Sequence, residues 1–298
     1  MPGGSLPLAK HNLSLHLTNT INMPKHWILP AMVSVFFFVS CNNIPVNEVA
    51  EDLHQAHRDQ QAFPVLTSQY PALKRPTAYA IQRLYVRERI GQEKIAGYKA
   101  ALTSVGSRQQ LNSDRAITGV LFGTGWKDSG DTIQKDQFIN PLLETEIGYV
   151  IKKPITDKLR SVSDVRSYLY GVVPAMEIPD VGFPDLSKME LEDFIATNSG
   201  SACFVLGEPV GIKYLDTNDL TARVTHNGQL VNTGKGKDTM GNQWDALFWL
   251  INNIIDQGYT IGEGQVLLTG ALGKVLPCQP GHYVADFGSI GQVELTVE

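Results

Sequence analysis

The sequence has few cysteines and no paired histidines, the residues that most often bind transition metals. Its three cysteines, Cys41, Cys203 and Cys278, lie far apart and form no CxxC pair, so neither a disulfide framework nor a zinc–thiolate site is predicted. The seven histidines are scattered, without an HExxH motif. A metal would therefore have to be held by carboxylates, whose oxygens select hard cations, Mg²⁺ or Mn²⁺ first.

The sequence also lacks runs of lysine or arginine and the glycine motifs of nucleotide-binding proteins. The net charge is -5, and binding to phosphate backbones needs clustered cations, so no nucleic acid is expected as the main partner. Neither GxGxxG nor GxxxxGK followed by Ser or Thr occurs, which leaves a nucleotide ligand without support. A site for a small molecule fits this charge balance better.

One apolar run, residues 27–39, is too short to cross a membrane comfortably. It follows Met23 and ends just before Cys41, which resembles a bacterial lipoprotein signal. On this interpretation residues 1–42 are a targeting segment, and translation starts at Met1 or Met23. Lipidated Cys41 would then anchor an exported, periplasmic protein to a membrane. The alternatives are a signal peptide without lipidation and a plain apolar extension, which would leave the protein cytoplasmic.

Helical periodicity appears in three segments of the remaining chain. Residues 47–60 and 77–90 each carry an apolar face and lie in a predicted N-terminal helical region, residues 43–95. A third helix follows Asn242, a suitable N-cap, and ends near Gly258. Its wide apolar stripe indicates core packing.

Short apolar runs rich in β-branched residues predict strands through the rest of the chain. Asn227-Gly228 lies between two of these runs and is typical of a two-residue hairpin. The fold class expected is therefore α+β, with a β-rich domain at residues 96–298 after the helical lead-in. The predicted strands are 95–98, 119–122, 144–151, 172–178, 202–206, 221–225, 229–231, 265–269, 283–287 and 292–297.

Two glutamates, Glu144 and Glu146, stand two residues apart in the predicted strand 144–151. Alternate residues of a strand point to the same face, so both carboxylates share one side of it. Neighbouring carboxylates repel each other, and a divalent cation would offset that repulsion. Because such a pair is a weak motif, two harmless solvent-facing acids remain the alternative.

A third acid, Glu177, interrupts the otherwise apolar strand 172–178. A buried carboxylate needs a cation or hydrogen-bond donors. Together with Glu144 and Glu146 it would complete a three-carboxylate site with positions left for water and substrate, as at hard catalytic cations. A glutamate that reaches solvent at the strand end is the alternative.

Two further positions could handle an anionic ligand. Lys99 ends an apolar strand, where a lysine can bind a carboxylate or move a proton, although a lone lysine there is more often a solvated strand end. Thr269-Gly270 follows another strand and can offer backbone N–H groups to an anion, or form a plain turn.

Several modest motifs, taken in order from about residue 47 to the end, resemble the 2-keto-4-pentenoate hydratase group of the fumarylacetoacetate hydrolase superfamily. Each motif alone is weak, but the ordered set is specific. The stretches are Ala78–Gln82, Gly97–Lys99, Leu102–Ser104, Glu144–Ile147, Pro174–Ile178, Asn198–Ser201, Gly241-Asn242, Leu268–Leu272 and Gly281–Gly291.

The resemblance implies a mixed β-roll, as in the fumarylacetoacetate hydrolase C-terminal domain, and a homo-oligomer. Glu144, Glu146 and Glu177 match the ligands of Mg²⁺ or Mn²⁺, and Lys99 matches a lysine that steers the substrate carboxylate or assists proton transfer. The implied reaction adds water to a 2-hydroxy-2,4-dienoate and gives a 4-hydroxy-2-oxo acid. Substrate contacts are assigned within the matching stretches to Ser201, Gly241, Asn242, Thr269 and Gly270.

This chain departs from the group at two positions. The group commonly has an acid near residues 121–125, where this chain has Thr124, and an Asp before the matching Asn, where it has Thr197. Both acids are candidates for general acid–base catalysis. Two alternatives to hydration therefore stay open. One is decarboxylation or C–C hydrolysis of a related 2-oxo acid, as with 4-oxalocrotonate, and the other is a surface binding protein without turnover.

Overall fold

The computed structural model describes residues 43–298, so the predicted targeting segment and Cys41 lie outside the described part of the chain. Within that part, no helix has both the length and the apolar character needed to cross a membrane. The prediction of lipidation stays a prediction.

Helices and strands alternate along the described chain. The helices are α1 Val46–Arg58, α2 Leu66–Gln69, α3 Arg75–Ile90, α4 Val105–Gln110, α5 Val162–Val165, α6 Leu191–Ala196 and α7 Gln243–Asp256. The strands are β1 Ile95–Ala101, β2 Ile117–Phe122, β3 Trp126–Asp128, β4 Thr132–Ile133, β5 Leu142–Ile151, β6 Leu169–Ile178, β7 Cys203–Leu206, β8 Thr221–His226, β9 Gln229–Lys235, β10 Val266–Leu268, β11 Leu276–Pro277, β12 Gly281–Asp286 and β13 Gln292–Val297.

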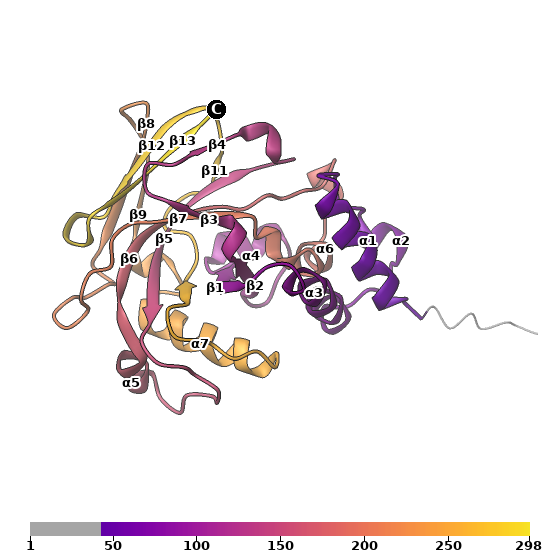
Figure 1. Cartoon of the computed structure of the whole chain (residues 1–298), viewed down its shortest axis with the longest axis horizontal. Helices are drawn as coiled ribbons and strands as arrows, with labels where there is room; N and C mark the ends of the chain where they lie inside the picture. Colours follow the sequence, from indigo (N-terminus) through magenta and orange to yellow (C-terminus); the bar gives the residue numbers. More distant parts are fainter. Residues whose placement is uncertain (1–42) are drawn as a thin grey trace, which may run out of the picture. The chain divides into compact units, whose positions relative to one another are not determined.

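The N-terminal helices pack against α6 and form a core of their own, and Figure 1 shows them grouped beside the strands. Their apolar faces meet through residues such as Leu53, Ile81 and Ile195, all fully buried. Asp193 of α6 ties this group together, because its carboxylate accepts hydrogen bonds from the backbone N–H (2.9 Å) and the hydroxyl (2.6 Å) of Thr67. A buried carboxylate with two donors is stabilised rather than orphaned.

The larger sheet has eight strands in the order β2-β1-β10-β5-β6-β7-β3, with β11 added beside β5. Its two longest strands, β5 and β6, run antiparallel at its centre. Because side chains alternate along a strand, one face carries Ile147 and Tyr149 into the main core, while the other carries Glu144, Glu146 and small apolar residues. Both faces of this sheet therefore carry buried side chains.

The second sheet has five strands in the order β4-β13-β12-β8-β9 and packs over the main core with α7. The β8–β9 hairpin turns at Asn227 and Gly228, whose φ angles of 50° and 79° are those of a type I′ turn. The α+β prediction with a helical lead-in is confirmed, and the predicted helices and strands are all present within a few residues of their expected bounds.

Candidate metal centre and the adjoining cleft

The pairing of β5 with β6 brings three acids together. Glu144 lies directly opposite Glu177, and Glu146 lies opposite Ala175, so all three carboxylates project from the same face of the sheet. One oxygen from each of the three carboxylates lies within 4.8 Å of the others. This is the ligand set predicted from the sequence, now assembled in space from two strands.

Two of the carboxylate oxygens have no donor nearby. Oε1 of Glu146 and Oε2 of Glu177 are buried without one, and both side chains are 0% exposed. The other oxygen of Glu146, Oε2, accepts a hydrogen bond of 2.6 Å from the backbone N–H of Gly270. Burying an unpaired carboxylate is costly, so this arrangement fits a cation held between the three groups.

Lys99 supplies the fixed positive charge of the cluster. Its Nζ lies 2.5 Å from Oε1 of Glu177, and the side chain is 1% exposed. Gly119 lies beside it on β2, where a Cβ atom would come within 3.3 Å of the Lys99 stem and 2.8 Å of the Asn198 carbonyl oxygen. A larger residue at that position would press on the Asn198 carbonyl and on the Lys99 side chain, so glycine is favoured there.

The titration of the cluster follows from its burial and its charge. Burial, and next the neighbouring Glu177, raise the pKa of half-buried Glu144 to about 7. Burial together with Glu177 and Glu144 also holds the pKa of Glu146 well above its ordinary value. Burial alone would lower the pKa of Lys99, but the glutamates outweigh it and raise that pKa. When all three carboxylates are ionised beside the Lys99 ammonium, the cluster carries two negative charges, which a divalent cation would neutralise.

A cleft of about 630 Å³ opens beside this cluster and is lined by Lys99 and Glu144. Its walls come from α4 and the residues just before it, from residues 179–194, and from residues 271–277. A small acid in the cleft would therefore lie next to both the ammonium group and the carboxylates.

The structure gives Thr269 and Gly270 supporting positions. The Thr269 hydroxyl is buried and donates to Gln243 Oε1 at 2.7 Å. Gly270 has a φ of 107°, and a Cβ there would lie 2.4 Å from Thr103 Oγ1, so only glycine fits. The predicted N–H donor to an anion is present, but the anion it contacts is Glu146 itself.

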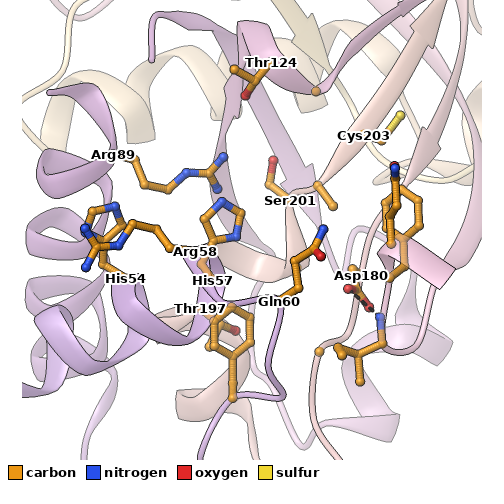
Figure 2. Close-up of a pocket in the computed structure, with 18 of the residues that line it drawn as sticks. His54, His57, Arg58, Gln60, Arg89, Thr124, Asp180, Thr197, Ser201 and Cys203 are labelled. Atoms are coloured by element: carbon orange, nitrogen blue, oxygen red, sulfur yellow. Dashed lines mark hydrogen bonds between the residues drawn. The ribbon is translucent and has the colours of Figure 1, made fainter. Parts of the chain in front are cut away.

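The remaining predicted substrate contacts lie away from the cleft. Asn242 caps α7, because its Oδ1 accepts a hydrogen bond of 2.8 Å from the Trp244 N–H, and Gly241 precedes it with a φ of 79°. Ser201 lines a second pocket (Figure 2). These three assignments remain predictions to which the geometry of the cleft adds nothing.

That second pocket, of about 590 Å³, also holds Thr124 and Thr197, the two positions where the family pattern has acids. The Thr124 hydroxyl contacts the Glu93 carboxylate, and the Thr197 hydroxyl donates to the Asp193 carbonyl at 3.0 Å. Neither threonine lines the cleft beside Lys99. In this chain both departures therefore lie outside the lining of the cleft.

Neither the cleft walls nor the close approach at Gly119 was predicted. A glycine inside the buried strand 119–122 is the signal that could have revealed the close approach. The walls come from short helices and connections without periodicity, which carry no such signal.

The chain is similar to known proteins over most of its length. The family model of the fumarylacetoacetate (FAA) hydrolase C-terminal domain matches residues 96–298. A 2-keto-4-pentenoate hydratase of Paraburkholderia xenovorans (strain LB400) is 29% identical over 254 residues, which cover 84% of this chain and 94% of that protein. A 4-oxalocrotonate decarboxylase of Pseudomonas sp. (strain CF600) is 26% identical over 238 residues, which cover 79% of this chain and 90% of that protein.

A solved structure has the same fold. The 4-oxalocrotonate decarboxylase from Pseudomonas putida G7, complexed with magnesium and adipate, superposes with a TM-score of 0.80 at 24% identity and covers 85% of this chain and 97% of that one.

Proposed function

The chain belongs to the fumarylacetoacetate (FAA) hydrolase C-terminal family, and we propose that it is a divalent-metal-dependent hydratase that adds water to a 2-hydroxy-2,4-dienoate. The resemblance to the 2-keto-4-pentenoate hydratase group is confirmed by the relatives it matches over most of its length. The proposal takes Glu144, Glu146 and Glu177 as the ligands of Mg²⁺ or Mn²⁺.

The observation that carries the proposal is the set of buried carboxylate oxygens without donors, next to a buried lysine at the end of an open cleft. A cluster of this kind would be destabilising without a cation, so its presence argues for a ligand-binding role rather than a structural one. The excess of two negative charges matches a divalent ion.

The reaction requires a proton to move and water to add. The 2-hydroxy group loses its proton and becomes a carbonyl, while C5 of the diene gains a proton. Water then adds across the C3–C4 double bond, with the hydroxyl on C4 and the hydrogen on C3. A bound divalent cation would supply Lewis acidity, which favours negative charge on the C2 oxygen.

In this proposal Lys99 binds the substrate carboxylate, and the Gly270 N–H orients one of the metal ligands. The Lys99 ammonium group faces the cleft, where it attracts the substrate carboxylate and can hold or pass a proton at Nζ. The Gly270 N–H fixes Oε2 of Glu146 and leaves Oε1 free for the cation.

Decarboxylation of a 4-oxalocrotonate-type acid is the second candidate. It is favoured by the relative of that name at 26% identity, which shares most of its length with this chain. The two candidates differ in their products, since only decarboxylation releases CO₂.

The test uses purified protein loaded with Mg²⁺ and 2-hydroxypenta-2,4-dienoate. Hydration would abolish the ultraviolet absorbance of the diene, and the rate would fall on chelation with EDTA and return with added Mg²⁺. Glu177→Gln should lose at least about 100-fold in kcat/KM, whereas Glu208→Gln, an exposed matched control, should retain full activity. If 4-oxalocrotonate loses CO₂ while the dienoate stays unchanged, the second candidate replaces the first. Binding without either reaction would contradict both.

A further inference from the structure

The cleft beside the cluster is much larger than the acid that the proposed reaction requires. Its volume of about 630 Å³ lies in the range of clefts that hold ligands of drug size. A five-carbon dienoic acid has eight non-hydrogen atoms, and its carboxylate end would lie at Lys99. Most of the cleft is therefore left for something attached to the far end of that acid.

Away from Lys99 and Glu144 the cleft is predominantly apolar. Among the described residues, the apolar part of its wall includes Leu111, Leu142, Val181, Met189, Phe194 and Pro277. These come from four segments that are distant in the sequence, so the fold alone brings them together around one cleft. A wall of this composition favours an uncharged, apolar group.

Two large apolar side chains at the cleft are left exposed. Leu186 is 43% exposed and Val275 is 41% exposed, and they belong to two different wall segments. A third wall residue, Leu102, has a left-handed backbone with a φ of 56°, which is rare for a leucine. Exposed apolar surface beside a binding cleft indicates a place where an apolar part of a ligand would bind and cover that surface.

The charges of the cleft argue against a second carboxylate on the substrate. Apart from Lys99 and Glu144, the one charged side chain among its described lining residues is Lys274, which is exposed. A hydrated surface ammonium holds a carboxylate only weakly. The other polar lining residues, Thr103, Ser104, Ser107 and Gln110, are uncharged, so a diacid would find no second buried cation for its far carboxylate.

We propose that this cleft is a tail subsite and that the substrate is a 2-hydroxy-2,4-dienoate with an uncharged alkyl or aryl substituent on C5. The proposal rests on the proposed hydratase function for its choice of head group. The tail itself is inferred from the volume, the apolar wall and the exposed Leu186 and Val275.

The first experiment measures binding without turnover. Calorimetry with Mg²⁺-loaded protein compares 2-oxopentanoate, 2-oxohexanoate and 2-oxooctanoate, and pairs 2-oxohexanoate with the diacid 2-oxoadipate. Burial of each methylene should tighten the dissociation constant about fourfold when complete, so the eight-carbon acid should bind at least tenfold better than the five-carbon acid. The diacid should bind more weakly than the monoacid of equal length.

The second experiment measures kcat/KM for dienoates with hydrogen, methyl, propyl or phenyl on C5. Leu186→Asp and Val275→Asp should each lower the ratio of propyl to unsubstituted kcat/KM at least tenfold. Leu230→Asp is the matched control, because Leu230 is 63% exposed on β9 and does not line the cleft, and it should leave that ratio unchanged.

The outcomes separate this inference from the proposed function. Tail-dependent binding with no turnover of any dienoate supports the subsite and overturns the hydratase. Turnover that does not rise with tail length overturns the subsite and leaves the hydratase standing. A preference for the diacid that disappears in Lys274→Met also overturns it, because the far end would then be a carboxylate site.

Discussion

At the scale of single residues, Lys99 opposes the binding of a cation, whereas the three glutamates favour it. Its ammonium group lies 2.5 Å from Glu177 and competes with any divalent ion for that carboxylate. The same charge is the one buried cation in the described part of the cleft that can attract a substrate carboxylate. Metal binding and catalysis should therefore respond in opposite directions to its removal.

Lys99→Met should tighten Mg²⁺ binding while lowering kcat/KM by at least about 100-fold, the contribution expected of a positioned acid–base group. Calorimetry gives the dissociation constant, and diene absorbance gives the rate. A variant that loses Mg²⁺ affinity together with activity would contradict this division of roles.

His57 offers a second test at this scale, away from the cluster. Burial, and then the Arg89 guanidinium, lower the pKa of this half-buried histidine to about 4. The unfolded chain binds a proton near pH 6.5, so the contribution of His57 to the free energy of unfolding is present above that pH and is lost as the pH falls toward 4.

His57→Gln should therefore make the protein less sensitive to acid. Between pH 7 and pH 4.5 the free energy of unfolding of the variant should fall by about 1–2 kcal/mol less than that of the parent, after allowance for the partial exposure of the ring. Urea unfolding at both pH values measures the difference, and equal losses in the two proteins would refute it.

At the scale of elements, a capping residue has to be distinguished from a substrate ligand. The resemblance assigns Asn242 to the substrate, whereas its position before the helix predicts an N-cap, and its side chain does accept hydrogen bonds from the first turn of α7. A cap stabilises the helix, whereas a substrate ligand changes KM.

Asn242→Ala should lower the free energy of unfolding by about 1 kcal/mol, as for other caps, and leave KM and the Mg²⁺ dissociation constant within twofold. Asn242→Asp, which keeps the acceptor, should restore the stability. A large rise in KM with unchanged stability would instead return Asn242 to the substrate site.

The strands also show which parts of the site could be predicted from the sequence. The period of two residues in a strand puts Glu144 and Glu146 on one face, and that needs no knowledge beyond the segment itself. The position of Glu177 opposite Glu144 depends on the register of β5 against β6, which single-sequence spacing does not determine. The residues alone left Glu177 equally compatible with a solvent-reaching strand end, and the resemblance decided between the two interpretations. The cleft walls were missed because α4, α6 and their connections are too short to show periodicity.

At the scale of the whole molecule, export remains a proposal. The apolar run 27–39 and Cys41 motivate it. Cells expressing the full chain and labelled with radioactive palmitate should yield a labelled, membrane-associated protein, and Cys41→Ser should abolish the label. An unlabelled protein in the soluble fraction would refute lipidation without touching the metal centre.

The contact between α6 and the N-terminal helices has a consequence for protein engineering. Phe194 of α6 forms part of the cleft, and the same short helix packs against α3, which in turn packs against α1. The family match begins at residue 96, after both of those helices. A truncation at that boundary would strip the backing from one wall of the cleft. Exchanging the lead-in between relatives would, by the same reasoning, be a route to new chain-length preferences with the metal ligands untouched.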